Sequence, residues 1–206
     1  CESCHGAGRE WIDIHNNFGV TGEQCEAVQK EDRAHRKERL ERSKAKGMRS
    51  SILKEIQTDY LYDLAANCYQ CHTVPYEKLV NIGGHKAGSN FELVAWSQGE
   101  IRHNFQCPDL GQNKETSLQQ KRVLFVLGQA LDLEYGLRGV ALAKDNPREH
   151  PQYVKAMYFR IKKAYQKLEE IKDKAPLTEI LGILQAIPKK EGGGLNIQFN
   201  NEAATL

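Results

Sequence analysis

Two stretches with one shared pattern govern the interpretation of this chain: Cys1-Glu2-Ser3-Cys4-His5 and Cys68-Tyr69-Gln70-Cys71-His72. The pattern, C-x-x-C-H, is the attachment signature of a c-type haem. Two thiols add across the vinyl groups of one porphyrin, and the two intervening residues set the separation of the sulfurs. The His that follows supplies the proximal iron ligand. The sequence therefore predicts two covalently attached haems, one held by Cys1, Cys4 and His5 and the other by Cys68, Cys71 and His72.

Chance does not account for the repeat. A chain of this length with six Cys and seven His is expected to contain about 0.006 such motifs. A zinc site built from two C-x-x-C pairs is the main alternative. Zinc gives no reason for a His directly after each pair, and a structural zinc ion needs four ligands in all. A disulfide or redox dithiol pair is a further alternative. We interpret both motifs as haem sites.

The composition is that of an ordinary globular protein. The 206 residues are 40% hydrophobic and 27% charged, which suits one domain or two small ones. No run approaches the roughly 18 apolar residues of a membrane span, so we expect no transmembrane segment. The formal net charge of +2 is too small to argue for a nucleic-acid partner. The haem propionates would lower that charge, so charge identifies no partner.

The expected compartment follows from the attachment chemistry. Covalent haem attachment takes place outside the bacterial cytoplasmic membrane, so we expect a periplasmic or extracellular protein. The sequence shows no signal peptide and begins on a haem-binding cysteine. We therefore expect that further residues precede Cys1 in the natural protein.

The chain as a whole predicts a mainly α protein in three parts. Residues 1–117 form a loop-rich multihaem cytochrome c segment that binds both haems. Within it, residues 23–46 interleave charges of opposite sign, which favours an exposed helix with i,i+4 ion pairs. An apolar stripe at helical spacing carries residues 52–68 into the second motif. Residues 73–90 are rich in glycine and predict a loop.

Residues 118–190 predict an antiparallel three-helix bundle. Two amphipathic helices are separated at Asp145-Asn146-Pro147, and Pro176 begins a short third helix. Apolar residues recur in both long helices at mostly three- or four-residue spacing. They are Val123, Leu124, Leu127, Leu131, Leu137 and Ala141 in the first helix, and Val154, Met157, Ile161, Ala164, Leu168 and Ile171 in the second.

Residues 191–206 form a C-terminal tail with a hinge at Gly192-Gly193-Gly194. The alternation over residues 195–199 is typical of a single strand, and a disordered tail is the equal alternative.

The second axial position of each iron needs a ligand or stays open. Three histidines lie in the haem-binding segment beside aromatic or glycine residues, and we expect them to be iron ligands together with His5 and His72. They are His15, His85 and His103. His35 lies in the charged stretch and is expected to be solvated. Cys25 and Cys107 belong to neither motif, and they either pair in an oxidising compartment or remain free thiols.

The first fifteen residues carry a family resemblance. The run from Cys1 to Arg9, CESCHGAGR, followed by His15 and by a second C-x-x-C-H motif, resembles the last two haem segments of the tetrahaem cytochrome c electron carriers of the hydroxylamine pathway in ammonia-oxidising bacteria. The resemblance covers roughly residues 1–72. The spacing between the motifs is longer here, and residues after 118 have no counterpart in that family.

The resemblance implies a set of distal ligands. His15 would be the distal ligand of the haem on Cys68, Cys71 and His72. In that family the haem of the preceding motif takes its distal ligand from a segment ahead of it, which this sequence lacks. The first haem here would then borrow His85 or His103, or these would ligate a haem that the sequence does not encode. The resemblance also implies a periplasmic, mostly helical protein with closely spaced haems.

These observations predict a multihaem c-type cytochrome that transfers single electrons between redox partner proteins, among them other multihaem cytochromes. Bis-His ligation would close both faces of each iron to substrates, so we expect an electron carrier rather than an enzyme. One alternative is a haem redox enzyme that acts on a small nitrogen oxide or oxygen species at a five-coordinate iron. Another is a structural subunit of a larger cytochrome assembly or filament.

Overall fold

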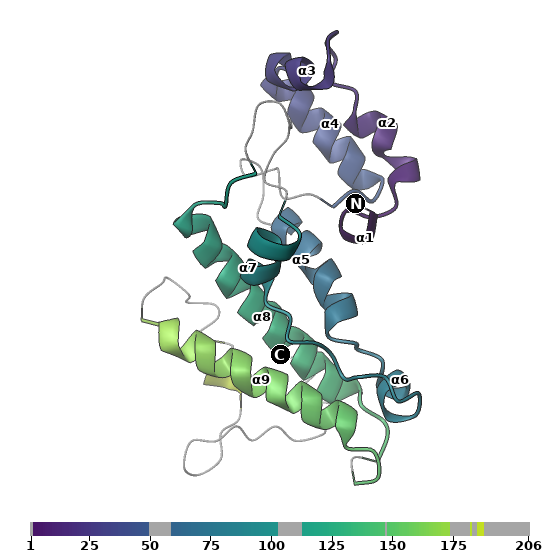
Figure 1. The fold of residues 1–206 in the computed structure, drawn as a ribbon, viewed down its shortest axis with the longest axis vertical. Helices are drawn as coiled ribbons and strands as arrows, with labels where there is room; N and C mark the ends of the chain where they lie inside the picture. Colours follow the sequence, from purple (N-terminus) through teal and green to yellow (C-terminus); the bar gives the residue numbers. More distant parts are fainter. Residues whose placement is uncertain are drawn as a thin grey trace. The chain divides into compact units, whose positions relative to one another are not determined.

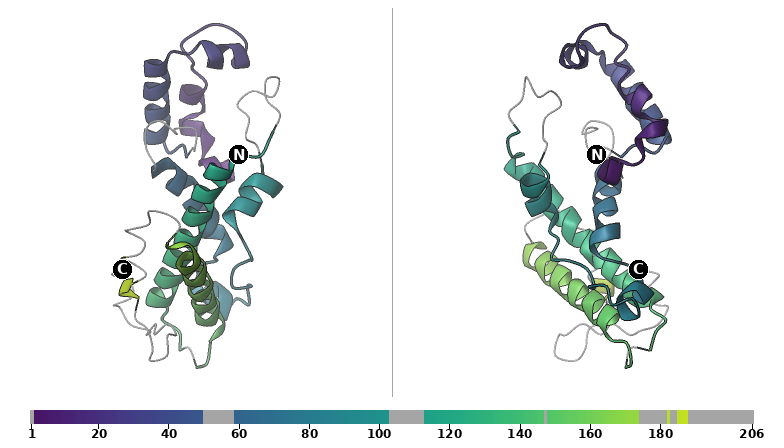
Figure 2. Two further views of the ribbon diagram at one scale, coloured as in Figure 1. Left: turned by 90° about the vertical axis from the view of Figure 1, so that its left-hand side faces the viewer. Right: turned by 45° about the vertical axis from the view of Figure 1, so that its right-hand side comes forward.

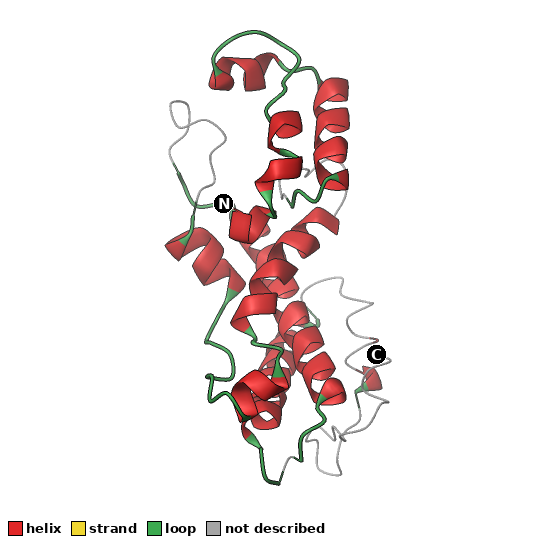
Figure 3. Cartoon of the chain, turned by 90° about the vertical axis from the view of Figure 1, so that its right-hand side faces the viewer, coloured by secondary structure: helices red, strands yellow, loops and turns green. Residues whose placement is uncertain are grey.

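The computed structural model describes residues 2–49, 59–102, 113–146, 148–173, 182 and 185–187. This part of the chain is helical and contains no strand (Figure 3), so the prediction of a mainly α protein is confirmed at that level. Contacts divide the chain into a first unit, residues 1–68 with 94–120, and a second unit, residues 69–93 with 121–206. The predicted boundary separates a haem-binding segment, residues 1–117, from a helical bundle, residues 118–190, and it stays a prediction.

The first unit begins with short helices that lead into a longer one. In chain order they are α1 (Glu2–His5), η1 (Gly8–Glu10), α2 (Ile12–His15), α3 (Gln24–Lys30) and α4 (Arg33–Ala45). Helix α2 lies beside α4 (Figure 1). Trp11, Leu40 and Met48 form a small buried cluster in this unit.

A glycine allows the first motif to rest on the segment that follows α4. Gly6 has φ +84°, and a Cβ atom there would lie 2.5 Å from the carbonyl oxygen of Gly47. Glycine is the residue that tolerates both the left-handed backbone and the close approach. The exit from α1 is thereby held against residues 47–49.

The charged stretch forms two helices and not the single exposed helix that was predicted. The chain breaks at Glu31-Asp32, where the Asp32 carboxylate accepts hydrogen bonds from the backbone N–H groups of Ala34 (2.9 Å) and His35 (3.1 Å). This is an ordinary N-cap, and it starts α4. Exposed i,i+4 pairs are present, such as Lys30 with Glu26 at 2.5 Å. Arg39, however, is only 6% exposed, because its guanidinium pairs with the buried carboxylate of Glu31.

Helix α5 (Asp59–His72) carries the second motif and crosses the boundary between the units, which falls after Cys68. Helix α6 (Glu77–Asn81) belongs to the second unit, the chain returns to the first unit within α7 (Leu93–Ala95), and the π-helical turn η2 (Trp96–Glu100) belongs to the first unit. Two long helices form most of the second unit. Helices α8 (Leu118–Leu142) and α9 (Gln152–Ile171) correspond to the first two helices that were predicted for residues 118–190. The predicted third helix lies outside the described residues except at 182 and 185–187, and so does the whole tail, 191–206.

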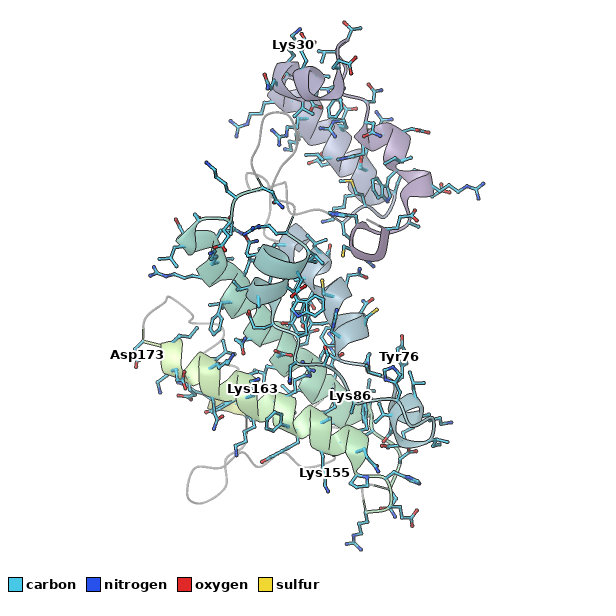
Figure 4. The ribbon with its side chains drawn as sticks, in the orientation of Figure 1. Lys30, Tyr76, Lys86, Lys155, Lys163 and Asp173 are labelled. Carbon is cyan, nitrogen blue, oxygen red and sulfur yellow. The ribbon has the colours of Figure 1, made fainter. Side chains whose placement is uncertain are left out.

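Helices α8 and α9 run side by side (Figure 2) and supply most of a buried apolar cluster. A Cβ atom on Gly136 would lie 2.6 Å from Cγ1 of Ile161 and 3.2 Å from the carbonyl oxygen of Met157. Glycine at this position therefore lets the two backbones approach closely. Lys155 and Lys163 lie on the exposed side of α9 (Figure 4). One member of the predicted stripe is misplaced, because Val123 is 47% exposed.

The stretch predicted as loop, residues 73–90, contains helix α6. The Glu77 carboxylate accepts hydrogen bonds from the backbone N–H groups of Lys144 (2.7 Å) and Asp145 (3.1 Å), in the turn between α8 and α9. Asn81 accepts from the backbone N–H of Tyr153 at 3.1 Å. These bonds to the turn after α8 and to the first turn of α9 stabilise a helix too short to form alone. Among the described helices, none is both long and apolar enough to cross a membrane.

Candidate haem-attachment sites

The first motif lies on α1. Cys1 is outside the described residues, while Cys4 and His5 are both half-buried. Nδ1 of His5 lies 2.6 Å from the carbonyl oxygen of Arg49. A carbonyl can only accept, so Nδ1 carries the ring proton and Nε2 keeps its lone pair. Histidines that bind metals are commonly oriented by such a bond. The backbone N–H of Arg49 in turn donates to the carbonyl oxygen of His5 at 2.9 Å.

The second motif occupies the last turns of α5. Cys68, Cys71 and His72 are three and four places apart on a helix, so they share one face. The Cys68 thiol lies 3.8 Å from the carbonyl oxygen of Leu64, and Cys71 is exposed. Nδ1 of His72 lies 3.1 Å from the Ser89 hydroxyl, and the Ser89 backbone N–H donates to the His72 carbonyl oxygen at 3.0 Å. With the hydroxyl as acceptor, Nε2 of His72 also keeps its lone pair.

Tyr69, which sequence reasoning treated as a spacer of the second motif, anchors it. Its side chain is fully buried, and its hydroxyl donates to the carbonyl oxygen of Gly128 in α8 at 2.9 Å. Its ring meets Phe91 edge-on with centroids 5.1 Å apart, while His72 stacks on the same Phe91 ring at 4.4 Å. The spacer position thus fixes the end of α5 against α8. In the sequence, the only sign of this anchoring role was that an aromatic residue stands between the two cysteines of the motif.

Helices α8 and α9 reach the second motif through a partly buried ion pair. Arg160 of α9 donates to the carboxylate of Asp132 in α8, and their side chains are 12% and 14% exposed. The other guanidinium nitrogen of Arg160 donates to the Ser89 carbonyl oxygen at 3.2 Å. Burial, and then the charge of Arg160, lower the pKa of His72. A neutral imidazole is the form that binds a metal. Helices α8 and α9 therefore support the histidine of the second motif.

His15, a predicted iron ligand, has the opposite hydrogen-bond polarity to His5. It lies at the end of α2 with its ring edge-on to Trp11. The nearest partner of its Nδ1 is the Arg39 guanidinium at 3.4 Å, and Arg39 also donates to the His15 carbonyl oxygen at 2.5 Å. A guanidinium only donates, so in this contact Nδ1 accepts and Nε2 carries the proton. Burial, Arg39 and then His5 lower the pKa of His15.

Arg39 is held by a buried carboxylate. Its Nε and Nη2 donate to the two oxygens of Glu31 at 2.6 and 2.7 Å, and its guanidinium covers the Phe18 ring at 4.6 Å. His35 also contacts Glu31, at 2.9 Å, and is not merely solvated as predicted. Burial by itself would raise the pKa of Glu31, but the hydrogen bonds from Arg39 and His35 outweigh it and lower that pKa.

The remaining predicted ligands lie elsewhere. His85 is exposed on the loop after α6, with Nδ1 2.8 Å from the Lys86 carbonyl oxygen, so its Nε2 keeps a lone pair. His103 and Cys107 lie outside the described residues, as does the side chain of Cys25. His5 and His15 belong to the first unit, while His72 and His85 belong to the second.

Nowhere in the described ranges do three His, Cys, Asp or Glu side chains gather as a site for a metal ion. A haem iron takes at most two protein ligands, so this finding concerns free metal ions and not haem. Comparison with protein families, with curated proteins and with solved structures finds no match to this chain. The resemblance to tetrahaem cytochromes therefore rests on the motif residues themselves.

Proposed function

We propose that this chain is a multihaem c-type cytochrome that transfers single electrons between redox partner proteins in the periplasm or outside the cell. Haem c attached at Cys1 and Cys4, and at Cys68 and Cys71, would have His5 and His72 as proximal ligands. The observation that carries the proposal is the repeated C-x-x-C-H motif.

The surroundings of the two motif histidines support this proposal. Each presents Nδ1 to an oxygen atom, the Arg49 carbonyl for His5 and the Ser89 hydroxyl for His72. The carbonyl partner of His5 places the ring proton on Nδ1 and the lone pair on Nε2, the nitrogen that would bind iron, and the same holds for His72 when the Ser89 hydroxyl accepts. Disulfide chemistry at the cysteines gives no role to this shared orientation.

A buried donor near the first motif also fits a haem. The indole N–H of Trp11 is buried and has no hydrogen-bond acceptor within the described residues. Leaving a buried N–H without an acceptor is costly, and a haem propionate is an acceptor of the right charge and size. When bound, the haem supplies an iron that alternates between the ferric and ferrous states. The protein's residues orient the two proximal histidines and hold Cys4, Cys68 and Cys71 on helices.

Intact mass and a pyridine haemochrome spectrum test the proposal directly. The holoprotein, produced in a host that attaches c-type haem, is expected to carry two haems per chain. Replacing Cys68 and Cys71 by Ser should remove one of them and leave the other. A Cys25→Ser variant is the matched control and should keep both. If the protein produced in such a host carries no covalent haem, the proposal is contradicted.

The polarity at His15 favours the enzyme alternative as a second candidate. As long as Nδ1 of His15 accepts from Arg39, its Nε2 carries a proton and has no lone pair for iron. If His15 keeps this contact in the holoprotein, a haem that depends on it for a distal ligand has an open coordination position. Such an iron could bind a small nitrogen oxide or oxygen species.

Electron paramagnetic resonance separates the two candidates. Bis-His ligation of both irons gives only low-spin ferric signals in the oxidised holoprotein, and an open position gives a high-spin signal. The carrier proposal predicts that His15→Ala converts one low-spin signal to high spin. An unchanged low-spin spectrum in that variant would exclude His15 as a ligand, and a high-spin signal already present in the unmodified protein would favour the enzyme.

A further inference from the structure

A closed ring of hydrogen bonds joins the first motif to the helix that carries the second. Arg49 accepts from Nδ1 of His5 through its carbonyl oxygen (2.6 Å) and donates its backbone N–H to the His5 carbonyl oxygen (2.9 Å). Its guanidinium Nη1 donates to Oδ1 of Asn67 at 2.6 Å. The Asn67 amide then donates to the carbonyl oxygen of Cys4 at 3.4 Å. All four residues belong to the first unit.

The position of Asn67 makes this ring relevant to both motifs. It directly precedes Cys68 in α5, and its amide group contacts the backbone of Cys4 in α1. Arg49 and Asn67 are eighteen positions apart and lie on either side of the segment at 50–58. The ring therefore ties the backbone that holds the first proximal histidine to the residue beside the first cysteine of the second motif.

We infer that Arg49 and Asn67 are positioning residues that fix the two haem-bearing helices α1 and α5 relative to each other, and so set the orientation and separation of the two haems for electron exchange. The inference rests on the proposed cytochrome function. The rate of electron exchange between two centres depends steeply on their separation. A link that restricts relative motion of the two helices would therefore affect that rate. The Arg49 guanidinium also brings a positive charge into this ring, and a positive charge near the first haem would favour the ferrous state of its iron.

Substitutions separate positioning from charge. Arg49→Ala removes both the link and the charge, while its backbone bonds to His5 remain. Arg49→Lys keeps the charge but loses the planar guanidinium that reaches Asn67. Asn67→Asp keeps Oδ1 for Arg49, replaces the donor to the Cys4 carbonyl oxygen with an acceptor, and adds a negative charge beside Arg49. Arg42→Ala is the matched control, since it deletes an arginine on α4 whose pairing with Glu38 is exposed.

The measurements are the magnetic interaction between the haems in the paramagnetic resonance spectrum and the midpoint potential of each haem. We expect Arg49→Ala, Arg49→Lys and Asn67→Ala to alter the haem–haem interaction, and the double variant Arg49→Ala with Asn67→Ala to show no more change than either single variant. Arg49→Ala should also lower the potential of the first haem, while Arg49→Lys should not. Arg42→Ala should leave both measurements unchanged.

The outcomes distinguish this inference from the proposed function. Two haems per chain with the same magnetic interaction in all variants would overturn the positioning role and leave the cytochrome proposal intact. An absence of haem from the unmodified protein would overturn the cytochrome proposal itself. If Arg49→Ala does not fold or load haem, Arg49→Lys and Asn67→Asp decide, because each removes one hydrogen bond of the ring and keeps the rest.

Discussion

At the scale of single residues, the second motif shows how a spacer position can anchor a candidate haem site. Tyr69 is fully buried while Cys71, two places on, is exposed. Successive helical positions lie about 100° apart, so one face of α5 can bind α8 while another presents the thiols. The buried hydroxyl of Tyr69 and the Thr73 hydroxyl, which donates to the Tyr69 carbonyl oxygen at 2.7 Å, hold this end of the helix.

Tyr69→Phe tests that anchor. The change keeps the ring against Phe91 and removes only the hydrogen bond to the Gly128 carbonyl oxygen. We expect the free energy of unfolding to fall by about 1 kcal/mol, the usual net value of one such bond. Denaturant unfolding of the holoprotein measures the change. Tyr76→Phe is the control, since Tyr76 is 65% exposed at the start of α6 (Figure 4). Equal effects of the two substitutions would contradict the anchoring role.

The sequence predicted the identity of the motif residues but not their surroundings. C-x-x-C-H names five consecutive positions, because the chemistry of the porphyrin fixes their spacing. Ser89, Arg49 and Arg160 reach the motif histidines from distant parts of the chain, and no local pattern marks such contacts. His15 could be identified as a candidate ligand from its neighbours in sequence. That its Nδ1 faces a guanidinium depends on how α2 packs on α4.

At the scale of helices, Glu31 determines how the charged stretch folds. Its side chain is buried at the join of α3 and α4 and forms a bidentate pair with Arg39, which is 6% exposed. Breaking a buried pair leaves one charge without compensation, which is the costly case. The i,i+4 pattern predicted helices here correctly. It could not indicate the ion pair between Glu31 and Arg39, which are eight residues apart, and this pair is what buries Arg39.

Glu31→Gln should therefore destabilise the holoprotein by about 3 kcal/mol near neutral pH. Because the pKa of Glu31 is lowered in the folded state from its usual 4.5, the ionised carboxylate stabilises the fold above that pH. This contribution is lost as the pH falls through the lowered value, so the difference between the variant and the unmodified protein should shrink below pH 4.5. Denaturant unfolding at a series of pH values measures it.

Glu41→Gln is the matched control for that series. Glu41 lies 4.0 Å from Lys37 on the exposed side of α4, and both side chains are more than half exposed. Exposed pairs of this kind contribute little, so we expect a change of less than about 0.5 kcal/mol with no trend below pH 4.5. A Glu31→Gln variant that behaves like this control would show that the buried pair does not hold α3 and α4 together.

The long helices were the most predictable elements. Two stripes with a Pro-containing break between them predicted α8 and α9 nearly at their observed ends. Periodicity works here because each helix buries an extended face. It fails at Val123, which lies near the start of α8 and is exposed. It also missed α6, whose five residues are too few for a periodic signal and depend on Glu77 and Asn81 bonding to a distant turn.

At the scale of the whole molecule, the two units can be compared by the buried apolar clusters that their described residues form. In the part of the chain that the structure describes, the second unit contains a cluster of thirteen buried residues supplied largely by α8 and α9. Among the described residues of the first unit, Trp11, Leu40 and Met48 form one such cluster. A small core stabilises a fold weakly unless a covalent link or a bound group adds to it. Under the proposed function, the attached haem adds that apolar contact.

The haem-free chain should accordingly lose structure unevenly. Replacing all four motif cysteines by Ser prevents attachment, and we expect the amides of residues 2–49 to exchange hydrogen much faster in this variant than in the holoprotein. The amides of α9 should keep most of their protection, because their cluster is formed by side chains alone. Hydrogen–deuterium exchange with mass spectrometry compares both regions in one sample, so α9 serves as the internal control. Equal protection of residues 2–49 with and without haem would show that the first unit folds on its own core, and a parallel loss in α9 would show that the haems stabilise both units alike.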